Sequence, residues 1–540
     1  MPVAQRLKKL ASETAIYGIS SVVGRLINFP LAFVYINVFD ESDYGVVGLV
    51  YVAVIFLNIL FTYGMEAAYM KFATDAGDGP GRQRVFSTVI WSLAGTTALF
   101  TLLILVFRDA FGDLVGVQAQ WYHLLYLTAG ILAFDTLAVV PFADLRLESR
   151  PWRFAALKLV NIGLNVGLNL VLIFALDWGI EAVFVANLAA SGVTLVLLAP
   201  ELLAKLRPVF DTSLWQNLVR FGLPFVPGGL AYMLADRVNV FFLEALSPAD
   251  VVRLYGADID VDRLAAQAAE AGAAAEARLA GSGMSPVEMA AQIAEASDAA
   301  YSLYVVGVFL GVLKLSIAVV LFTQMFRFAW QPFFLQHAKD ADAPRLFAKV
   351  FTVFTSVGLS ITLAVSMFAQ ELAAIPLPNG GTLIPKTYWI ALPVLPLALL
   401  AYVAQGWYYT FSAGAYLKER TRYFIYCAVA GSAVSIALNS VLVPQFGMLG
   451  AVGSTCISFI GMALMLFALV QRVYPVPYEW GRVLTLVVLA AGLFATWALV
   501  PAAQIWWAEV AILAGFAIVG LVLIRAGANT RISPDATGTV

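Results

Sequence analysis

The sequence is poor in charged residues, and this shortage excludes most classes of soluble protein. Asp, Glu, Lys and Arg together make up 12% of its 540 residues, whereas 61% of the residues are hydrophobic. Soluble domains hold roughly 25% charged residues, so this composition is typical of a helical bundle in a membrane. The formal net charge of −2 gives no indication of nucleic-acid binding.

Cysteine and histidine are scarce as well, with two residues of each. Cys427 and Cys456 lie in late apolar stretches, far from His123 and His337. We interpret the cysteines as small apolar side chains of a core, and we expect no disulfide, no metal site and no cofactor. The nucleotide-binding pattern G-x-x-x-x-G-K-[ST] is absent, so an ion gradient or the membrane potential would have to drive any uphill transport.

Long apolar stretches are what the sequence has in abundance, and each is about the 20 residues that a helical crossing needs. They predict an all-α polytopic membrane protein with about fourteen transmembrane helices. Arg25 interrupts the first stretch and no cleavage site follows, so we expect this helix to remain as an anchor. The predicted spans are 14–38, 45–70, 86–107, 120–143, 154–176, 180–200, 217–246, 301–325, 346–369, 387–413, 424–444, 448–470, 483–501 and 504–525.

Basic residues gather in every second connection, beginning with the N-terminus. Those connections hold 24 of the 32 Lys and Arg residues, the opposite connections hold five, and three fall inside spans. Basic residues resist translocation, so the crowded side is predicted to be cytoplasmic, with both termini inside. The 24 are Arg6, Lys8, Lys9, Lys71, Arg82, Arg84, Arg146, Arg150, Arg153, Lys158, Lys205, Arg207, Arg220, Arg327, Lys339, Arg345, Lys349, Lys418, Arg420, Arg422, Arg472, Arg482, Arg525 and Arg531.

Two parts of the chain resemble each other. Leu168-Asn169-Leu170-Val171-Leu172 recurs as Leu438-Asn439-Ser440-Val441-Leu442, and a glycine follows each, Gly179 and Gly450. Upstream, Glu148-Ser149-Arg150 resembles Glu419-Arg420-Thr421-Arg422. The spacing predicts two six-helix lobes that form a parallel pseudo-two-fold repeat about an axis along the membrane normal.

This repeat divides the chain into four predicted parts. Residues 1–205 form the N-terminal lobe and 206–482 the C-terminal lobe. Residues 483–525 add two transmembrane helices, and 526–540 form a cytoplasmic tail.

The connection 247–300 is longer than the others and is predicted to lie outside. It is rich in Ala and Glu, and Ser285-Pro286-Val287-Glu288 predicts a helix with an N-cap, a first-turn proline and a capping box. Ser247-Pro248-Ala249-Asp250 is a looser copy of this signal. We expect a helical hairpin on the outer face, with a gate, a docking site or a disordered insert as alternatives.

Five charged residues fall inside apolar spans, where each charge costs roughly 2.5–3.5 kcal/mol on insertion scales. They are therefore expected to face protein or water rather than lipid. Asn28 follows the first of them by one turn, and Asn239 lies close to the fourth. The five are Arg25, Asp135, Asp236, Arg237 and Lys314.

Two interpretations of these charges stay open. In the first they are an internal brace, in which Arg237 pairs with Asp135 or Glu66, because the adjacent Asp236 points in a different direction around the helix. In the second, Arg25, Arg237 and Lys314 line a water-filled cavity for an anionic group, and phosphate or diphosphate suits arginine best. Asp135, Asp236 and Glu66 are then candidates for ion coupling.

Several stretches together resemble the polysaccharide transporter family, the O-antigen and exopolysaccharide flippase branch of a superfamily that also holds multidrug and toxin extrusion transporters and lipid II flippases. The resemblance covers roughly residues 10–480. The stretches are Ala15-Ile16-Tyr17-Gly18, Asp43-Tyr44-Gly45, Tyr63-Gly64-Met65-Glu66-Ala67-Ala68 with Lys71-Phe72, Leu234-Ala235-Asp236-Arg237, Phe328-Ala329-Trp330-Gln331-Pro332-Phe333-Phe334, and Leu438-Asn439 to Gly450-Ala451.

The resemblance implies two lobes in a V around a central cavity. It also implies a transporter, not an enzyme, that flips a polyprenyl-diphosphate-linked oligosaccharide across the bacterial cytoplasmic membrane by alternating access. Arg25 and Arg237, with Lys314 in addition, would be the cavity cations. The family further implies a monomer and, as partners, a polysaccharide polymerase or glycosyltransferases. The long connection 247–300 departs from the family pattern.

Two other functions remain as alternatives. A membrane glycosyltransferase or polymerase could use Asp40-Glu41-Ser42-Asp43 as catalytic carboxylates, although that loop is short and no large outer domain accompanies it. An ion-coupled exporter of cationic drugs could use Asp135 or Asp236, although the three intramembrane cations outnumber these two acids.

Overall fold

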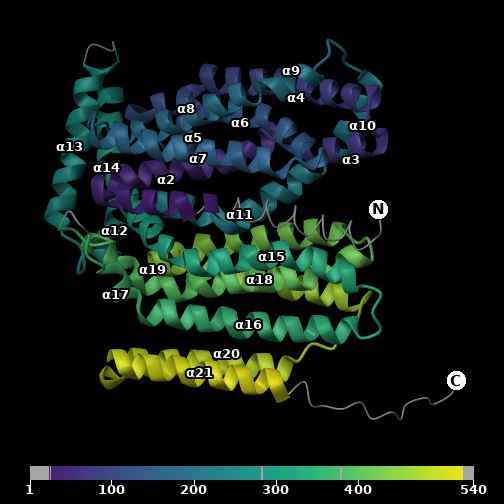
Figure 1. The fold of residues 1–540 in the computed structure, drawn as a ribbon. Coiled ribbons are helices and arrows are strands. Elements are labelled where there is room, and N and C mark those ends of the chain that lie inside the picture. The colour runs from purple at the N-terminus through teal and green to yellow at the C-terminus, as the bar shows by residue number, and fades with distance from the viewer. Residues whose placement is uncertain (1–22, 25, 281–283, 378–379, 527–540) are drawn as a thin grey trace. The chain divides into compact units, whose positions relative to one another are not determined.

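The computed structural model describes residues 23–24, 26–280, 284–377 and 380–526. Over these residues the chain is built from helices, as the apolar stretches predict (Figure 1). Arg25 and the basic residues Arg6, Lys8, Lys9 and Arg531 lie outside the described residues.

The helices of the first half follow each other with short connections. The first described one is Leu26–Val38. It is followed by α2 (Glu41–Thr62), α3 (Met65–Ala76), α4 (Pro80–Val106), α5 (Arg108–Val115), η1 (Ala119–Trp121), α6 (His123–Leu147), α7 (Pro151–Phe174), α8 (Glu181–Leu197) and α9 (Ala199–Lys205).

The second half begins with α10 (Thr212–Gly222) and α11 (Phe225–Glu244). It continues with α12 (Pro248–Tyr255), α13 (Val261–Leu279), α14 (Pro286–Val312), η2 (Leu313–Ser316), α15 (Ile317–His337), α16 (Ala343–Met367), α17 (Ala369–Ala373), η3 (Lys386–Val394), α18 (Leu395–Leu417), α19 (Arg422–Gln471), α20 (Trp480–Leu499), η4 (Pro501–Ala503) and α21 (Trp506–Ala526).

Eleven of the described helices are long and apolar enough to cross a membrane, or twelve if the bent pair α8 and α9 forms one span. The 50-residue α19 turns at Gly447, whose φ of 54° and ψ of −127° are not helical, three residues after Pro444. The predicted eleventh and twelfth spans are therefore the two arms of α19. The multi-pass membrane fold is confirmed, and the number fourteen stays a prediction.

By contacts the chain divides into two compact units. Unit 1 comprises Met1–Lys314, Pro376–Ala391 and Ala428–Ser454, and unit 2 comprises Leu315–Ile375, Leu392–Cys427 and Thr455–Val540. One boundary falls inside η2, where the helical path from α14 to α15 is interrupted. The lobe boundaries at 205 and 482 stay predictions.

Within unit 1, α2 and α14 cross at very short distance because glycines lie at the crossing. A Cβ atom on Gly307 would overlap the carbonyl oxygen of Glu41, and one on Gly45 would overlap that of Leu303. Small residues let two membrane helices approach until their backbones touch. These helices are the second and eighth predicted spans, which are equivalent in the proposed repeat. The two predicted repeats therefore contact each other at this crossing.

Unit 2 has an aromatic core around the connection between α19 and α20. The ring of Phe351 packs against Trp407, Phe411 and Tyr478, with ring centroids 4.9–6.0 Å apart. Such ring pairs add roughly 0.5–1.5 kcal/mol each beyond the area they bury. The cluster ties the connection before α20 to α16 and α18.

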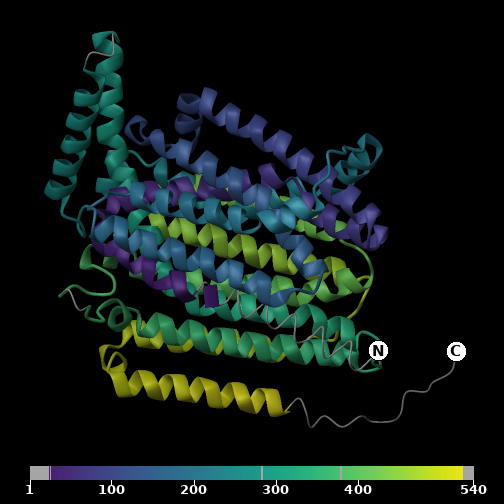
Figure 2. The ribbon, with the colours of Figure 1, turned by 45° about the horizontal axis from the view of Figure 1, so that its top comes forward.

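The connection 247–300 forms helices whose starts agree with the prediction. Ser285 and Glu288 form a complete capping box at the start of α14, and the Ser247 hydroxyl accepts from the backbone N–H of Asp250. The helix α13 packs along α14 through Leu264, Ala268 and other small apolar residues. This hairpin projects beyond the neighbouring helices of unit 1 (Figure 2).

The base of the hairpin is tied to the kink of α19. The hydroxyl of Tyr255 accepts a hydrogen bond from the backbone N–H of Met448 at 2.7 Å, and Arg253 donates to the carbonyl of Pro444 at 2.6 Å. Burial raises the pKa of Tyr255 to about 12, so the phenol stays neutral at physiological pH. These bonds fix the base of the hairpin to the rest of unit 1.

The two similar sequence stretches have the same local structure. The amide of Asn169 donates to the carbonyl of Asn165 at 2.9 Å, and the amide of Asn439 donates to the carbonyl of Ser435 at 2.8 Å. Both asparagines are fully buried. The repeat suggested by the Leu-Asn match therefore includes a matching side-chain hydrogen bond.

The turns before these helices also match. Arg150 N–H donates to the Leu145 carbonyl, and Arg420 N–H donates to the Ala415 carbonyl. The residue before each arginine, Ser149 or Glu419, has a positive φ of 53° or 55°. Each turn is a Schellman-type helix end, in which one residue adopts the left-handed conformation.

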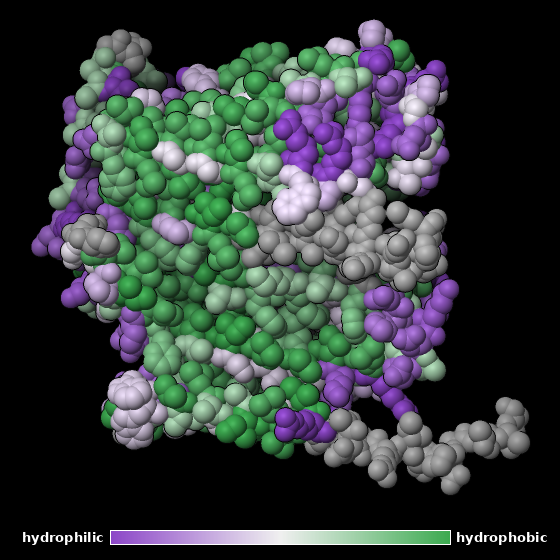
Figure 3. Space-filling model, in the orientation of Figure 1, coloured by the Kyte–Doolittle hydropathy of each residue, from purple (hydrophilic) through white to green (hydrophobic). Residues whose placement is uncertain are grey.

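Apolar side chains cover the flanks of the helices on the face shown in Figure 3, and hydrophilic ones gather toward helix ends. Many large apolar residues are exposed, for example Leu102, Val488 and Leu521. Exposed apolar area of this extent indicates a lipid-facing surface.

Candidate functional site

The predicted cations are only partly described. Arg25 lies outside the described residues, and Asn28 is exposed on the helix Leu26–Val38. Lys314 is half-buried in η2, between α14 and α15. That Lys314 faces protein or water rather than lipid stays a prediction.

The prediction that Asp236 and Arg237 are poor partners is wrong. On α11 the Nε atom of Arg237 lies 3.0 Å from a carboxylate oxygen of Asp236. A long arginine side chain can reach a neighbour whose Cα–Cβ direction differs, so side-chain directions alone do not anticipate this contact. Asn239 is buried on the same helix.

The other acids proposed as partners of Arg237 interact elsewhere. Glu66 on α3 pairs with Arg146 at the end of α6. Asp135, exposed on α6, interacts with Ser191 on α8 and more remotely with Lys158 on α7. Both acids thus interact with residues of their own half.

A row of polar residues runs along α7, and we did not single it out from the sequence. Lys158, Asn161, Asn165 and Asn169 follow each other at intervals of three or four residues and share one face of the helix. With Asp135 on α6, we define these five residues as the polar track. The spacing was visible in the sequence, but the surrounding apolar residues concealed it.

The polar track is connected to neighbouring helices of unit 1. Tyr35 donates to Asn169 at 2.8 Å, and Asn161 donates to the Thr194 hydroxyl at 2.8 Å. Polar side chains inside a membrane bundle are costly, and such residues often mark pathways for ions or polar substrates. The track supplies amide oxygens and one carboxylate, which suit a proton or a small cation.

A second charged group lies at the end of the helices that is predicted to be cytoplasmic. The buried carboxylate of Asp144 binds Arg82, Tyr69 and Lys205, and Lys205 also binds Glu148. A cavity of about 640 Å³ opens beside these residues. Positive and negative charges pair closely, so the group is best explained as a brace between α4, α6 and α9.

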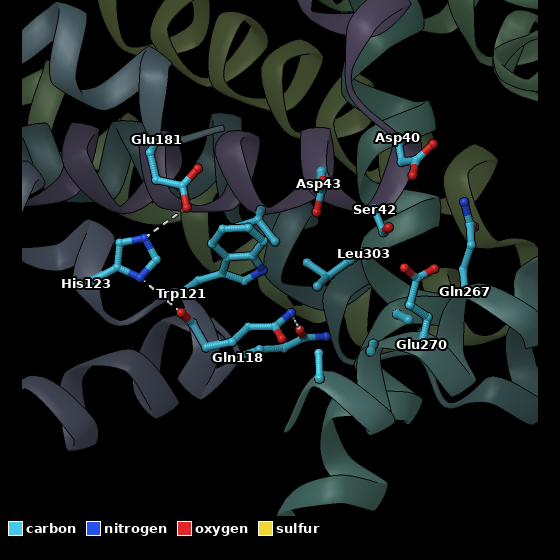
Figure 4. Close-up of a pocket in the computed structure, with 15 residues that line it drawn as sticks. Asp40, Ser42, Asp43, Gln118, Trp121, His123, Glu181, Gln267, Glu270 and Leu303 are labelled. Atoms are coloured by element: carbon cyan, nitrogen blue, oxygen red, sulfur yellow. Dashed lines mark hydrogen bonds and ion pairs between the residues drawn. The ribbon is translucent and has the colours of Figure 1, made fainter. Parts of the chain in front are cut away.

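A third feature is a polar cavity of about 430 Å³ in unit 1, at the end of the helices that is predicted to face outside. We call it the outer pocket (Figure 4). Its lining comes from six places in the chain: the start of α2, η1, the start of α6, the start of α8, α13 and α14. The lining residues are Asp40, Ser42, Asp43, Val46, Gln118, Gln120, Trp121, His123, Glu181, Gln267, Glu270, Ala271, Ala274, Ala300 and Leu303.

Hydrogen bonds fix one wall of the outer pocket. His123 contacts Glu181 at 3.2 Å through Nε2 and the carbonyl of Gln120 at 3.0 Å through Nδ1. Gln118 donates to the carbonyl of Ala296 on α14 at 3.0 Å. The indole of Trp121 lies between these groups and Asp43 (Figure 4).

Two of the acids that an outer-loop enzyme would need, Asp40 and Glu41, already form ion pairs. Arg263 of α13 contacts the buried carboxylate of Glu41 at 3.2 Å and that of Asp40 at 3.7 Å. These ion pairs connect the hairpin to the start of α2. Among the described residues no group of three His, Cys, Asp or Glu side chains has the geometry to hold a metal ion.

Comparison with known protein families finds a match to part of the chain. Residues 38–250 match the family described as "Polysaccharide biosynthesis protein". No curated protein matches the sequence.

Solved structures of low sequence identity share the fold. An inward-facing multidrug resistance transporter of the MATE family, in the MOP superfamily, has a TM-score of 0.59 at 15% identity, over 83% of this chain and 94% of its own. The lipid II flippase MurJ in an inward closed conformation has a TM-score of 0.56 at 12% identity, over 95% and 98%.

A third structure is a MOP superfamily transporter from Pyrococcus furiosus, whose binding pocket is described as having reverse polarity. Its TM-score is 0.53 at 14% identity, over 85% of this chain and 95% of its own. The resemblance seen in the sequence is therefore confirmed: the chain has the fold of these transporters, and residues 38–250 match a polysaccharide biosynthesis family.

Proposed function

We propose that this protein is a flippase that moves a polyprenyl-diphosphate-linked oligosaccharide across the bacterial cytoplasmic membrane for surface polysaccharide synthesis. One observation carries the proposal: a chain with a polysaccharide biosynthesis match over residues 38–250 has the fold that a lipid II flippase also has. Transport, rather than an enzymatic reaction, is the activity that this fold supports.

In the proposed mechanism two lobes, 1–205 and 206–482, alternate between states open to either side. The cations Arg25, Arg237 and Lys314 would receive the diphosphate, because guanidinium groups bind phosphate oxygens through paired donors. Asp236 would hold the Arg237 guanidinium in place through the 3.0 Å ion pair. Removing the substrate leaves Arg237 with this local counter-charge, which limits the cost of an empty cavity.

The polar track would couple transport to an ion. Asp135 is its only carboxylate and could carry a proton. The amide oxygens of the track could help Asp135 to coordinate a small cation. Asp236 and Glu66 are weaker candidates, since each already pairs with an arginine. Asn28 and Asn239 stay proposed partners of the substrate near the cations.

The test is Arg237→Ala in a strain whose own copy of the gene is deleted. We expect surface glycan to fall at least tenfold while the protein stays in the membrane, because a buried charge-assisted contact contributes roughly 1.5–3 kcal/mol. Arg220→Ala, on α10 outside the apolar part of the span, is the matched control and is expected to retain wild-type glycan. Wild-type glycan in Arg237→Ala would refute the cationic cavity.

One observation favours the alternative of a drug exporter: the chain shares the fold of a MATE transporter. In that alternative Asp135 of this chain would be the coupling acid. It predicts that deletion of the gene sensitises cells to cationic drugs and leaves surface glycan unchanged. The flippase predicts the opposite pair of results, so one deletion strain decides between them.

A further inference from the structure

We propose that the outer pocket binds a sugar unit of the translocated oligosaccharide, one that is uncharged or carries an amine, and that it excludes uronic acids. This inference rests on the proposed function. It assigns to the pocket a part in selecting the glycan, separate from the cations that would receive the diphosphate.

The first support is the shape of the pocket. A volume of about 430 Å³ falls in the ~300–1,000 Å³ range of small-molecule sites. The hairpin supplies one wall through Gln267 and Glu270, and the first half supplies the opposite wall through Trp121 and Glu181. The pocket therefore exists only because the connection 247–300 is long and ordered.

The second support is unused hydrogen-bonding capacity around an aromatic ring. Asp43, Gln267 and Glu270 line the pocket, and none of their side chains forms a hydrogen bond or ion pair with another described residue. Carboxylates and amides accept from and donate to hydroxyl groups in pairs, and an indole offers a flat apolar face. A sugar ring, with hydroxyls around its edge and C–H groups on its faces, matches both properties.

The third support is the charge of the lining. It holds the carboxylates Asp40, Asp43, Glu181 and Glu270 and no Lys or Arg, and His123 is its only basic side chain. A pocket lined by one sign of charge repels ligands of that sign. Uronic acids and the diphosphate are therefore disfavoured, whereas neutral sugars are tolerated and amino sugars are attracted.

Binding can be measured on the purified full-length protein in nanodiscs by saturation-transfer NMR. The probes are N-acetylglucosamine, glucosamine and glucuronic acid, each at millimolar concentration. We expect transfer to the first two sugars, at least fivefold less to glucuronic acid, and loss of transfer in Trp121→Ala. Trp178→Ala removes an exposed tryptophan that does not line the pocket, and it should retain transfer.

Transport can be tested by blocking the pocket. Ala274→Cys places a thiol on its lining, and Ala273→Cys places one on the adjacent exposed residue, which is not part of the lining. The natural cysteines are buried. A membrane-impermeant thiol reagent added to cells should lower newly exported glycan at least fivefold in Ala274→Cys and less than twofold in Ala273→Cys.

The outcomes separate this inference from the proposed function. Three results would each overturn the pocket assignment. They are equal saturation transfer to the sugars in Trp121→Ala and Trp178→Ala, no saturation transfer to any probe, and equal loss of export in both cysteine variants. Glycan export that survives deletion of the gene would instead overturn the flippase itself. Preference for glucuronic acid would refute the charge argument and with it the assigned sugar class.

Discussion

The two repeated halves have the same local structure at their fifth and eleventh spans but differ in the side chains along those helices. Positions 270 residues apart carry the same buried asparagine, Asn169 and Asn439, and the same helix-ending turn. At the same spacing, Lys158 corresponds to Ala428, Asn161 to Gly431, and Asp135 to Gln405.

The difference indicates which features serve the fold and which serve the function. The turn and the asparagine bond occur in both halves, so they are explained by the architecture alone. The charged members of the polar track occur only in the first half, so the architecture does not require them. Unequal polarity in an otherwise repeated pair of helices is what an ion-coupling site in one lobe would produce.

The largest expected effect is on glycan export, and it tests whether the two halves differ in function. Asp135→Ala is expected to lower glycan export at least tenfold, because the track loses its only carboxylate. Gln405→Ala, at the corresponding position of the second half, should change export less than threefold. Surface glycan measured at equal protein levels tests both, and equal effects in the two variants would remove the functional asymmetry.

The next effect concerns the place where the halves meet. Gly307→Ala puts a methyl group against the Glu41 carbonyl and is expected to cost about 1–3 kcal/mol, because overpacking forces the backbones apart. Gly453→Ala is the matched control, since a Cβ there meets nothing within 4 Å. Thermal unfolding in detergent measures both. A Gly307 variant as stable as its control would mean that α2 and α14 do not meet as closely as described.

A smaller effect is expected on stability, and it should differ between Asn169 and Asn439. Asn169→Ala removes the acceptor of the half-buried Tyr35 hydroxyl and is expected to destabilise by about 1–3 kcal/mol, the cost of leaving a polar group inside the bundle without its partner. Asn439→Ala loses a bond to a carbonyl that already has a helical partner, so about 0.5–1.5 kcal/mol is expected. Thermal shifts of the reverse order would contradict this reasoning.

The smallest effect should be the same in both halves. Ser149 and Glu419 adopt positive φ at equivalent turns. Replacing each by Gly should stabilise the protein by up to about 1 kcal/mol, because glycine adopts this conformation without a Cβ penalty. Opposite signs for Ser149→Gly and Glu419→Gly would show that the turns are not equivalent.

Much of the fold follows from local physics that the sequence displays. Apolar runs predicted the helices, and the Ser285 and Glu288 pair predicted where α14 begins, because capping depends on residues three positions apart. The Leu-Asn recurrence indicated the repeat for a similar reason. Each of these signals lies within one helix or one turn.

The parts that could not be foreseen depend on distant segments. The outer pocket forms between α13 and η1, more than 140 residues apart in sequence, and no local pattern reveals that pairing. The partner of Glu66 proved to be Arg146, since α3 and α6 pack together. The spacing of the polar track is visible in the sequence, but its asparagines carry no charge, so the cost of burying charges does not single them out.

The helix α14 connects the outer pocket with the glycine crossing. This helix runs without interruption from the capping box at Ser285 to Val312, which is 27 residues or about 40 Å. Two of its residues, Ala300 and Leu303, line the outer pocket, and Leu303 with Gly307 forms the glycine crossing with α2 one turn further along. A ligand in the outer pocket would therefore lie beside the glycine crossing, and a movement of α14 that it causes would loosen or tighten the contact with α2.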